Sequence, residues 1–98
     1  FYEVDNWEAA CDLCIRLLQF GGLGHSLVIH SNNEQVVMEF AMKKPVFRIL
    51  CNTPSAQGAI GYTTGLAPSL TLGCGTFGGN ITSDNVTARH LMNAARVL

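Results

Sequence analysis

The fold is decided by two short apolar runs, Ser26-Leu27-Val28-Ile29-His30 and Val46-Phe47-Arg48-Ile49-Leu50-Cys51. Large apolar side chains dominate both runs, as is typical of strands that a parallel sheet buries on both faces. Between the runs, Ser31-Asn32-Asn33-Glu34 has the pattern of a capping box, and it opens a helical pattern over residues 32–43 that Lys-Lys-Pro stops. The order strand, helix, strand predicts parallel pairing with a right-handed crossover.

The N-terminal residues add one strand and one helix to this prediction. Residues 1–4 have a strand-like composition, and Asp5 followed by Glu8 has the pattern of a capping box for a helix over residues 6–20. One face of that helix carries an apolar stripe of Trp7, Cys11, Cys14 and Leu18. We therefore predict an α/β fold, a parallel β-α-β-α-β sheet with strands at 1–4, 26–30 and 46–51.

The second half of the chain has a different character. From residue 52, proline and glycine punctuate a segment of small and hydroxylated residues, and a loop this long inside a compact fold is usually functional. We expect a short strand at 69–72, a glycine-rich turn at 73–79 and a final helix through Met92 that Asp84 or Thr87 caps. The predicted single domain, 1–98, thus comprises β-α-β-α-β (1–51), a loop with the glycine-rich turn (52–79) and a C-terminal helix region (80–98).

Composition limits the classes of partner. Hydrophobic residues make up 48% of the 98 and charged residues only 13%, so we expect the chain to bury surface against the rest of a larger domain or a second copy. The formal net charge of −1, with scattered Lys and Arg, argues against nucleic acid, and the apolar runs are too short to cross a membrane. The opening Phe1-Tyr2-Glu3-Val4 lacks an initiator methionine and leader, so we expect a cytoplasmic piece of a longer protein.

Three motifs invite a chemical interpretation, and each has a structural alternative. Cys11-x-x-Cys14 could hold zinc, but no second cysteine pair exists and both residues lie on the apolar stripe, which favours the core. Gly73-x-Gly75-x-x-Gly78 matches a dinucleotide fingerprint, but no complete βαβ unit follows it, which favours a tight turn. His25 could act as a base or contact a ligand, or only bond a carbonyl group. His30 and His90 have no supporting constellation.

One long segment carries a family resemblance. It runs Asn52-Thr53-Pro54-Ser55-Ala56-Gln57-Gly58 and then, from 61 to 80, Gly-Tyr-Thr-Thr-Gly-Leu-Ala-Pro-Ser-Leu-Thr-Leu-Gly-Cys-Gly-Thr-Phe-Gly-Gly-Asn. This segment resembles the C-terminal signature of CoA-acylating aldehyde dehydrogenases. The continuation Ile81-Thr82-Ser83-Asp84-Asn85-Val86-Thr87 resembles the propionaldehyde type of bacterial microcompartments, whose lumen is then a second expected location.

The resemblance implies the C-terminal portion of a catalytic domain. The intact parent would oxidise a small aldehyde with NAD and transfer the acyl group to coenzyme A through a cysteine thioester. The family places that nucleophile and the NAD-binding domain upstream of Phe1, and Cys74, inside the signature, does not match the nucleophile's motif. The resemblance therefore implies no catalytic residue in this chain, no activity of the chain alone, and no tight binding of NAD or coenzyme A by it.

The resemblance also implies a substrate entrance along residues 52–79. Its candidate substrate-binding residues are Thr53, Pro54, Ser55, Thr76 and Phe77, together with His25. The alternative is a loop that packs only against its own domain. The expected partners are the remainder of the catalytic domain and further copies in a homo-oligomer. A competing hypothesis is a stand-alone binding or assembly module that associates through its open sheet edge; a zinc-binding regulator is a third.

Overall fold

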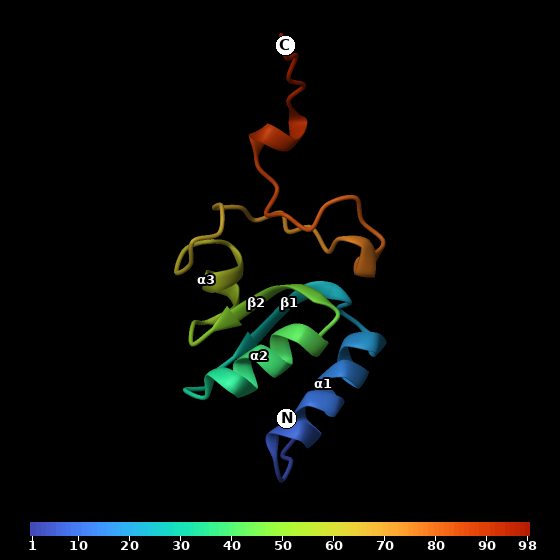
Figure 1. Cartoon of the computed structure of the whole chain (residues 1–98), viewed down its shortest axis with the longest axis vertical. Coiled ribbons are helices and arrows are strands. Elements are labelled where there is room, and N and C mark those ends of the chain that lie inside the picture. The colour runs from blue at the N-terminus through green and yellow to red at the C-terminus, as the bar shows by residue number, and fades with distance from the viewer.

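The computed structural model describes all 98 residues and arranges them in two layers around a small sheet (Figure 1). In chain order the helices and strands are α1 (Trp7–Phe20), β1 (Gly24–Ile29), α2 (Glu34–Lys43), β2 (Val46–Cys51) and α3 (Ser55–Ala59). Two 3₁₀ turns follow, η1 (Thr76–Gly78) and η2 (Ala88–Leu91). The α/β class predicted from the sequence is confirmed.

The sheet consists of β1 and β2, which pair in parallel as predicted. Gly24 pairs with Val46 at the start of the strands and Ile29 with Cys51 at their end. Just beyond that end, the side chain of Asn52 accepts from the Ser31 amide at 3.0 Å and donates to the Ser31 carbonyl at 3.1 Å. This clamp holds the C-terminal ends of both strands in register.

The predicted first strand is wrong. Residues 1–4 form no strand and are exposed, because no neighbouring strand offers them hydrogen-bond partners. The cap of α1 is Asn6 rather than Asp5: its side chain accepts from the Ala9 amide at 2.8 Å. The chain is therefore α-β-α-β over its first 51 residues.

The caps of α2 also differ from the prediction. Asn33, not Ser31, caps the helix, because its side-chain oxygen accepts from the amides of Gln35 and Val36. Ser31 instead accepts from the Asn33 amide and shapes the approach to the cap. The helix consequently begins at Glu34, two residues later than predicted.

One face of the sheet packs against α1 and α2. The core of this layer is Cys11, Ile29 and Phe40, one residue from each of three elements. Trp7, Cys14, Leu27 and Ile49, among others, surround it. Lys44 closes the layer: its buried ammonium lies 4.1 Å above the centre of the Phe40 ring and donates to the Cys11 sulfur. The stripe on α1 is thus a core stripe, as its period predicted.

The opposite face of β2 lies under the second half of the chain. Val46, Arg48 and Leu50 alternate along the strand and are all buried, whereas Phe47 is exposed and Ile49 is half-buried. α3 contacts both strands, and Gly58 approaches Leu50 so closely that an added Cβ would lie 3.3 Å from its side chain. The loop predicted from residue 52 onward therefore forms the second layer.

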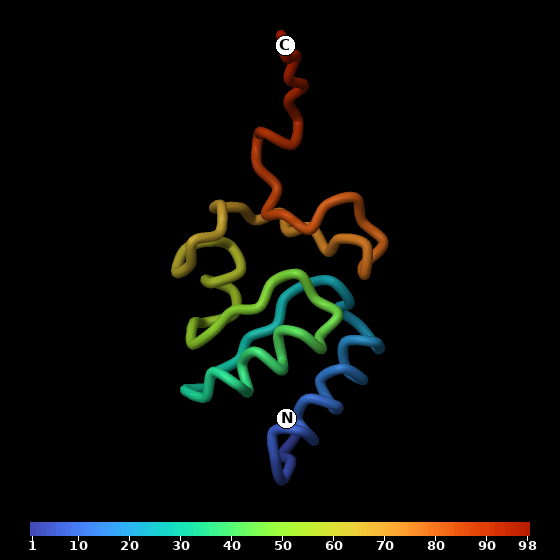
Figure 2. Tube along the Cα trace, viewed as in Figure 1, coloured from blue at the N-terminus to red at the C-terminus, as the bar shows by residue number.

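The C-terminal residues extend away from this body, as the tube in Figure 2 shows. The molecule measures 57 × 27 × 26 Å with a radius of gyration of 15.5 Å, against about 13 Å for a compact domain of 100 residues. The predicted strand at 69–72 is reduced to a single bridge between Leu72 and Asn85. The predicted final helix is only the one-turn η2, which Thr87 precedes and caps through a capping box with His90.

Much apolar surface is left uncovered. Only 15 of the 98 residues are buried, and the exposed large side chains include Phe20, Tyr62, Leu70, Phe77 and Ile81. A soluble monomer rarely leaves extended apolar surface open to water. No helix in the structure is long and apolar enough to span a bilayer.

We predict that Gly24→Ala destabilises the fold. Gly24 has φ +78°, and an added Cβ would clash with the Cys74 carbonyl and the Gly78 amide. The strain of the backbone and the overlap together should cost about 3 kcal/mol in free energy of unfolding. Chemical denaturation measures this cost. The control is Gly65→Ala, where nothing lies within 4 Å of an added Cβ. Equal stability of the two variants would contradict the close packing of β1 against the glycine-rich turn.

Candidate functional site

A buried arginine ties the two layers together. Arg48 on β2 is only 4% exposed, and its Nε donates to the Asn85 side-chain oxygen at 3.0 Å. Its terminal nitrogens donate to the main-chain carbonyls of Gly73, Ser83 (3.3 Å) and His25 (3.5 Å). Every one of these acceptors is an uncharged oxygen.

Asn85 extends the same network into the loop. It is 6% exposed, and its amide nitrogen donates to the carbonyls of Ala59 at 2.8 Å and Ala67 at 2.9 Å. One side chain thus joins Arg48, the end of α3 and the loop that follows it. Because all of its hydrogen-bonding groups are used, this amide can sit in the interior at little cost.

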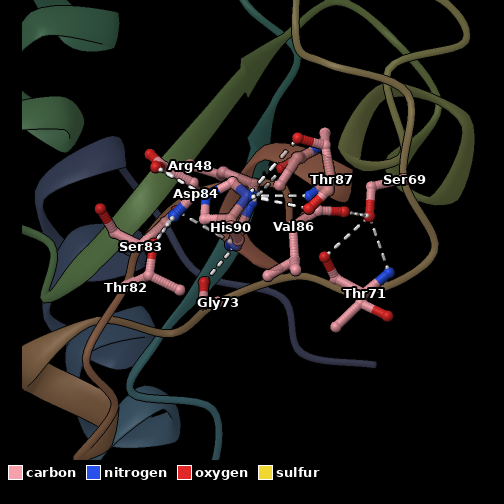
Figure 3. A network of polar contacts seen from close by, with 11 residues as sticks. Arg48, Ser69, Thr71, Gly73, Thr82, Ser83, Asp84, Val86, Thr87 and His90 are labelled. Atoms are coloured by element: carbon pink, nitrogen blue, oxygen red, sulfur yellow. Dashed lines mark hydrogen bonds and ion pairs between the residues drawn. The ribbon is translucent and has the colours of Figure 1, made fainter. Parts of the chain in front are cut away.

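A short antiparallel pairing surrounds Arg48 and Asn85. The amide of Gly73 donates to the Asp84 carbonyl (2.8 Å), that of Gly75 to Thr82 (2.9 Å), and that of Val86 to Thr71 (2.8 Å). Figure 3 shows Arg48 beside Gly73 and Ser83, with Ser69 bridging the Thr71 and Val86 ends of the pairing. The irregular segment therefore has a defined structure of its own.

Burial lowers the pKa of Arg48, and the nearby acidic groups of Cys74 and Asp84 offset part of this effect. A guanidinium nevertheless stays charged in any accessible pH range. The site thus contains a permanent, desolvated positive charge that no carboxylate of the chain contacts directly.

Next to Arg48 lies the largest cleft of the molecule, with a volume of about 600 Å³. Its lining combines three hydrophobic residues with glycine, polar and charged residues. Its lining residues are Phe47, Arg48, Gly65, Leu66, Ala67, Ser83, Asp84, Asn85, Thr87, Arg89 and His90. None of the six residues predicted to bind substrate is among them.

Three of those six residues lie beyond the C-terminal end of β2. Pro54 caps α3 and Ser55 is its first residue. Thr53 is buried at 8% exposure, and its hydroxyl pairs with that of Thr63. This group therefore sits at the end of the sheet where the strands of parallel α/β folds present their ligand sites.

The other three residues lie at the start of the strands. His25 is the second residue of β1, and Thr76 and Phe77 belong to η1, which packs against β1. The Phe77 ring stacks on Phe47 with centroids 4.9 Å apart, and Phe77 and His25 line a hollow of about 350 Å³. One strand length, about 17 Å, separates this group from Thr53–Ser55.

The glycine-rich turn holds protein rather than a cofactor. Gly75 has φ +56°, and an added Cβ there would meet the Phe47 ring; one at Gly78 would meet the Cys74 sulfur and the Leu23 carbonyl. A dinucleotide loop needs that space for a pyrophosphate and a following helix, whereas η1 has three residues. Gly73-x-Gly75-x-x-Gly78 does not fit an NAD phosphate, and the tight turn is the correct interpretation.

Three of the four cysteines fill structural positions, and Cys51 is exposed. Cys11 belongs to the core cluster and Cys14 packs against that cluster, which confirms the core interpretation of the pair. Cys74 is buried under the glycine-rich turn, where its sulfur accepts from the Asn80 side chain at 3.4 Å. No group of three or more His, Cys, Asp or Glu side chains converges to form a metal site.

Sequence reasoning missed Arg48 and Asn85. The available signal was a charged residue in the middle of an otherwise apolar strand, because such a residue is rarely buried without a specific partner. Nothing comparable marks Asn85, whose partners lie 18 to 37 residues away along the chain.

No family model matches the chain. The chain is 44% identical over 96 residues to aldehyde-alcohol dehydrogenase 2 of Entamoeba histolytica, in an alignment that covers 97% of this chain and 11% of that protein. Two solved structures match all of it with TM-scores of 0.90: a probable aldehyde dehydrogenase from Listeria monocytogenes (49% identical) and an acetylating aldehyde dehydrogenase from Geobacillus thermoglucosidasius (45%). The chain spans 22% and 23% of those two proteins.

We predict that Arg48→Met loosens the second layer and leaves the first intact. The substitution strips the Asn85 oxygen and the Gly73 and Ser83 carbonyls of their donor, at a cost of about 3 kcal/mol. The amides of Gly73 and Val86 should then exchange hydrogen about 100-fold faster by mass spectrometry or NMR. The control is Arg16→Met on α1, an exposed arginine. Unchanged protection at Gly73 and Val86 would show that Arg48 does not hold the layer.

Proposed function

We propose that this chain, homologous over its whole length to a segment of acylating aldehyde dehydrogenases, is part of an enzyme that oxidises a small aldehyde with NAD and transfers the acyl group to coenzyme A. The observation that carries the proposal is the whole-chain structural match to an acetylating aldehyde dehydrogenase at high sequence identity. Both groups of residues that are predicted to bind substrate lie within the segment that this match covers.

The chain's role in that reaction is to build a wall of the substrate site. NAD, when bound, supplies the hydride acceptor, and the resemblance places the cysteine nucleophile outside this chain. Here Cys74 is buried against Gly78 and Asn80, with no room for an attacking substrate. The wall residues hold and orient the aldehyde and exclude water from it.

The group at the start of the strands, His25, Thr76 and Phe77, offers the better contact surface for a substrate. Phe77 is about half exposed, so it offers a free aromatic face while Phe47 supports the other face. His25 lines the same hollow and Thr76 precedes Phe77 on η1. An aromatic face with a few polar groups at its edge suits a small aldehyde. Pro54 and Ser55 form the second group, and buried Thr53 holds their loop through Thr63.

The remainder of the same catalytic domain is the proposed partner of the exposed apolar surface. Phe20, Tyr62, Leu70 and Ile81 are each at least 79% exposed, and they belong to both layers. We further propose that the protein that carries this chain forms a homo-oligomer in the cytoplasm. For a propionaldehyde-type substrate the location is the lumen of a bacterial microcompartment.

We predict that Phe77→Ala in the protein carrying this chain raises KM for the aldehyde about tenfold and leaves KM for NAD unchanged. Loss of one aromatic wall removes roughly 1–2 kcal/mol of contact with a small apolar substrate. Steady-state NADH absorbance measures both constants. The control is Tyr2→Ala, which removes an exposed aromatic ring near the N-terminus, outside the proposed substrate site. A Phe77 variant with the wild-type KM for the aldehyde would show that η1 does not contact the substrate.

A second prediction concerns the thiol chemistry. Cys74→Ala should retain the acylating activity of the protein to within a few-fold, whereas loss of a nucleophile lowers kcat by a factor of about 10³ or more. The separate 98-residue chain should produce no NADH from propionaldehyde, coenzyme A and NAD. NADH produced by the separate chain and abolished by Cys74→Ala would overturn this assignment of roles.

A further inference from the structure

Phe47 lies on β2 but outside the core of the sheet layer. It alternates along the strand with buried Arg48, and 41% of its surface is open to solvent. The close contacts of its ring come instead from the glycine-rich turn, residues 73–79, which lies far along the chain. These contacts show what the ring supports.

The first contact is with the main chain at Gly75. An added Cβ at Gly75 would overlap the Phe47 ring, so the ring occupies space that only a glycine leaves open. Gly75 has φ +56° and is the residue directly before η1. The Phe47 ring therefore rests against the chain at the point where η1 begins.

The second contact is with the Phe77 ring inside η1. The two rings stack with centroids 4.9 Å apart and an angle of 27° between their planes. η1 has only three residues, and no side-chain hydrogen bond caps its start. Because so short a 3₁₀ turn has little stability of its own, the stacked ring is what fixes the orientation of Phe77.

The stacked pair stands between two hollows of the surface. Phe77 lines the hollow of about 350 Å³ that His25 also lines, whereas Phe47 lines the cleft beside Arg48 and is absent from that hollow. Phe47 thus lies behind Phe77 as seen from the hollow. Removal of the Phe47 ring would leave space into which the Phe77 ring would turn.

We propose that Phe47 is a positioning residue for the aldehyde substrate, which holds Phe77 at the wall of the hollow and thereby restricts the hollow to small aldehydes. The proposal rests on the proposed function, in which Phe77 contacts the aldehyde. A ring that is already held in place loses little rotamer freedom when the substrate binds, so its contact with the substrate is stronger. Phe47 acts only through Phe77, because it does not line the hollow itself.

The test is a double-mutant cycle in the whole protein that carries this chain, with steady-state kinetics on propionaldehyde and on the longer aldehyde hexanal. Phe47→Ala should raise KM for propionaldehyde about fivefold and leave KM for NAD unchanged. The ratio of kcat/KM for hexanal to kcat/KM for propionaldehyde should rise about threefold or more, since the hollow becomes wider. The matched control is Tyr2→Ala, which removes an exposed aromatic ring and should leave all these constants unchanged.

The cycle separates a positioning role from a merely structural one. If Phe47 acts through Phe77, adding Phe47→Ala to Phe77→Ala should change KM for propionaldehyde by less than about twofold. An equal increase in KM with and without the Phe77 ring would overturn the proposal. An unchanged KM in the single variant Phe47→Ala would overturn it too.

Hydrogen exchange distinguishes failure of this proposal from failure of the proposed function. The amides of Gly79 and Asn80 donate to the carbonyls of Thr76 at 3.1 Å and Gly75 at 2.8 Å. Both amides should exchange about tenfold faster in Phe47→Ala, because η1 loses its support. Faster exchange in a protein without acylating activity supports the hold of Phe47 on η1 and contradicts the proposed function. Unchanged exchange overturns the proposal, whatever the activity.

Discussion

The buried guanidinium of Arg48 is the interaction on which the second half of this molecule depends. The segment after α3 has almost no regular structure. Its main-chain N–H and C=O groups therefore need hydrogen-bond partners other than those of a helix or sheet. Arg48 supplies donors to Gly73 and Ser83, and Asn85 carries the same network to Ala59 and Ala67. Donors from Arg48 on β2 thereby hold a loop whose large apolar side chains, such as Tyr62, Leu70 and Ile81, are exposed and form no core of their own.

The glycines of the second layer follow from this arrangement. Because Arg48 draws the 71–75 and 82–86 pairing onto the sheet, main chain meets main chain at Gly24 and Gly73, and any side chain there would collide with a carbonyl. Gly75 and Gly78 accommodate the Phe47 ring and the Cys74 sulfur in the same way. The glycine spacing that resembles a nucleotide fingerprint is thus a packing requirement of the protein itself.

The first layer could be predicted from local pattern, and the second could not. The bounds of β2 and the end of both long helices follow from apolar runs, Pro45 and glycine, each of which acts within a few residues. Residues 1–4 failed as a strand because a strand requires a partner, which no local pattern supplies. The six residues predicted to bind substrate lie in two separate places. His25 and Phe77 line one hollow at the start of the strands, whereas Thr53–Ser55 follow the other end of β2. The cleft at Arg48 depends on Asn85, and no signal in the sequence joins those two residues.

The chain therefore combines a sheet layer that local sequence determines with a loop layer held by one charged side chain, and the proposed function places substrate against the second. Product analysis by mass spectrometry, with propionaldehyde, NAD and coenzyme A, tests this function most directly on the whole protein that carries the chain. Acylating chemistry predicts propionyl-coenzyme A formed in equal amount to NADH. Free propionate formed at the same rate without coenzyme A, or no oxidation at all, would contradict it.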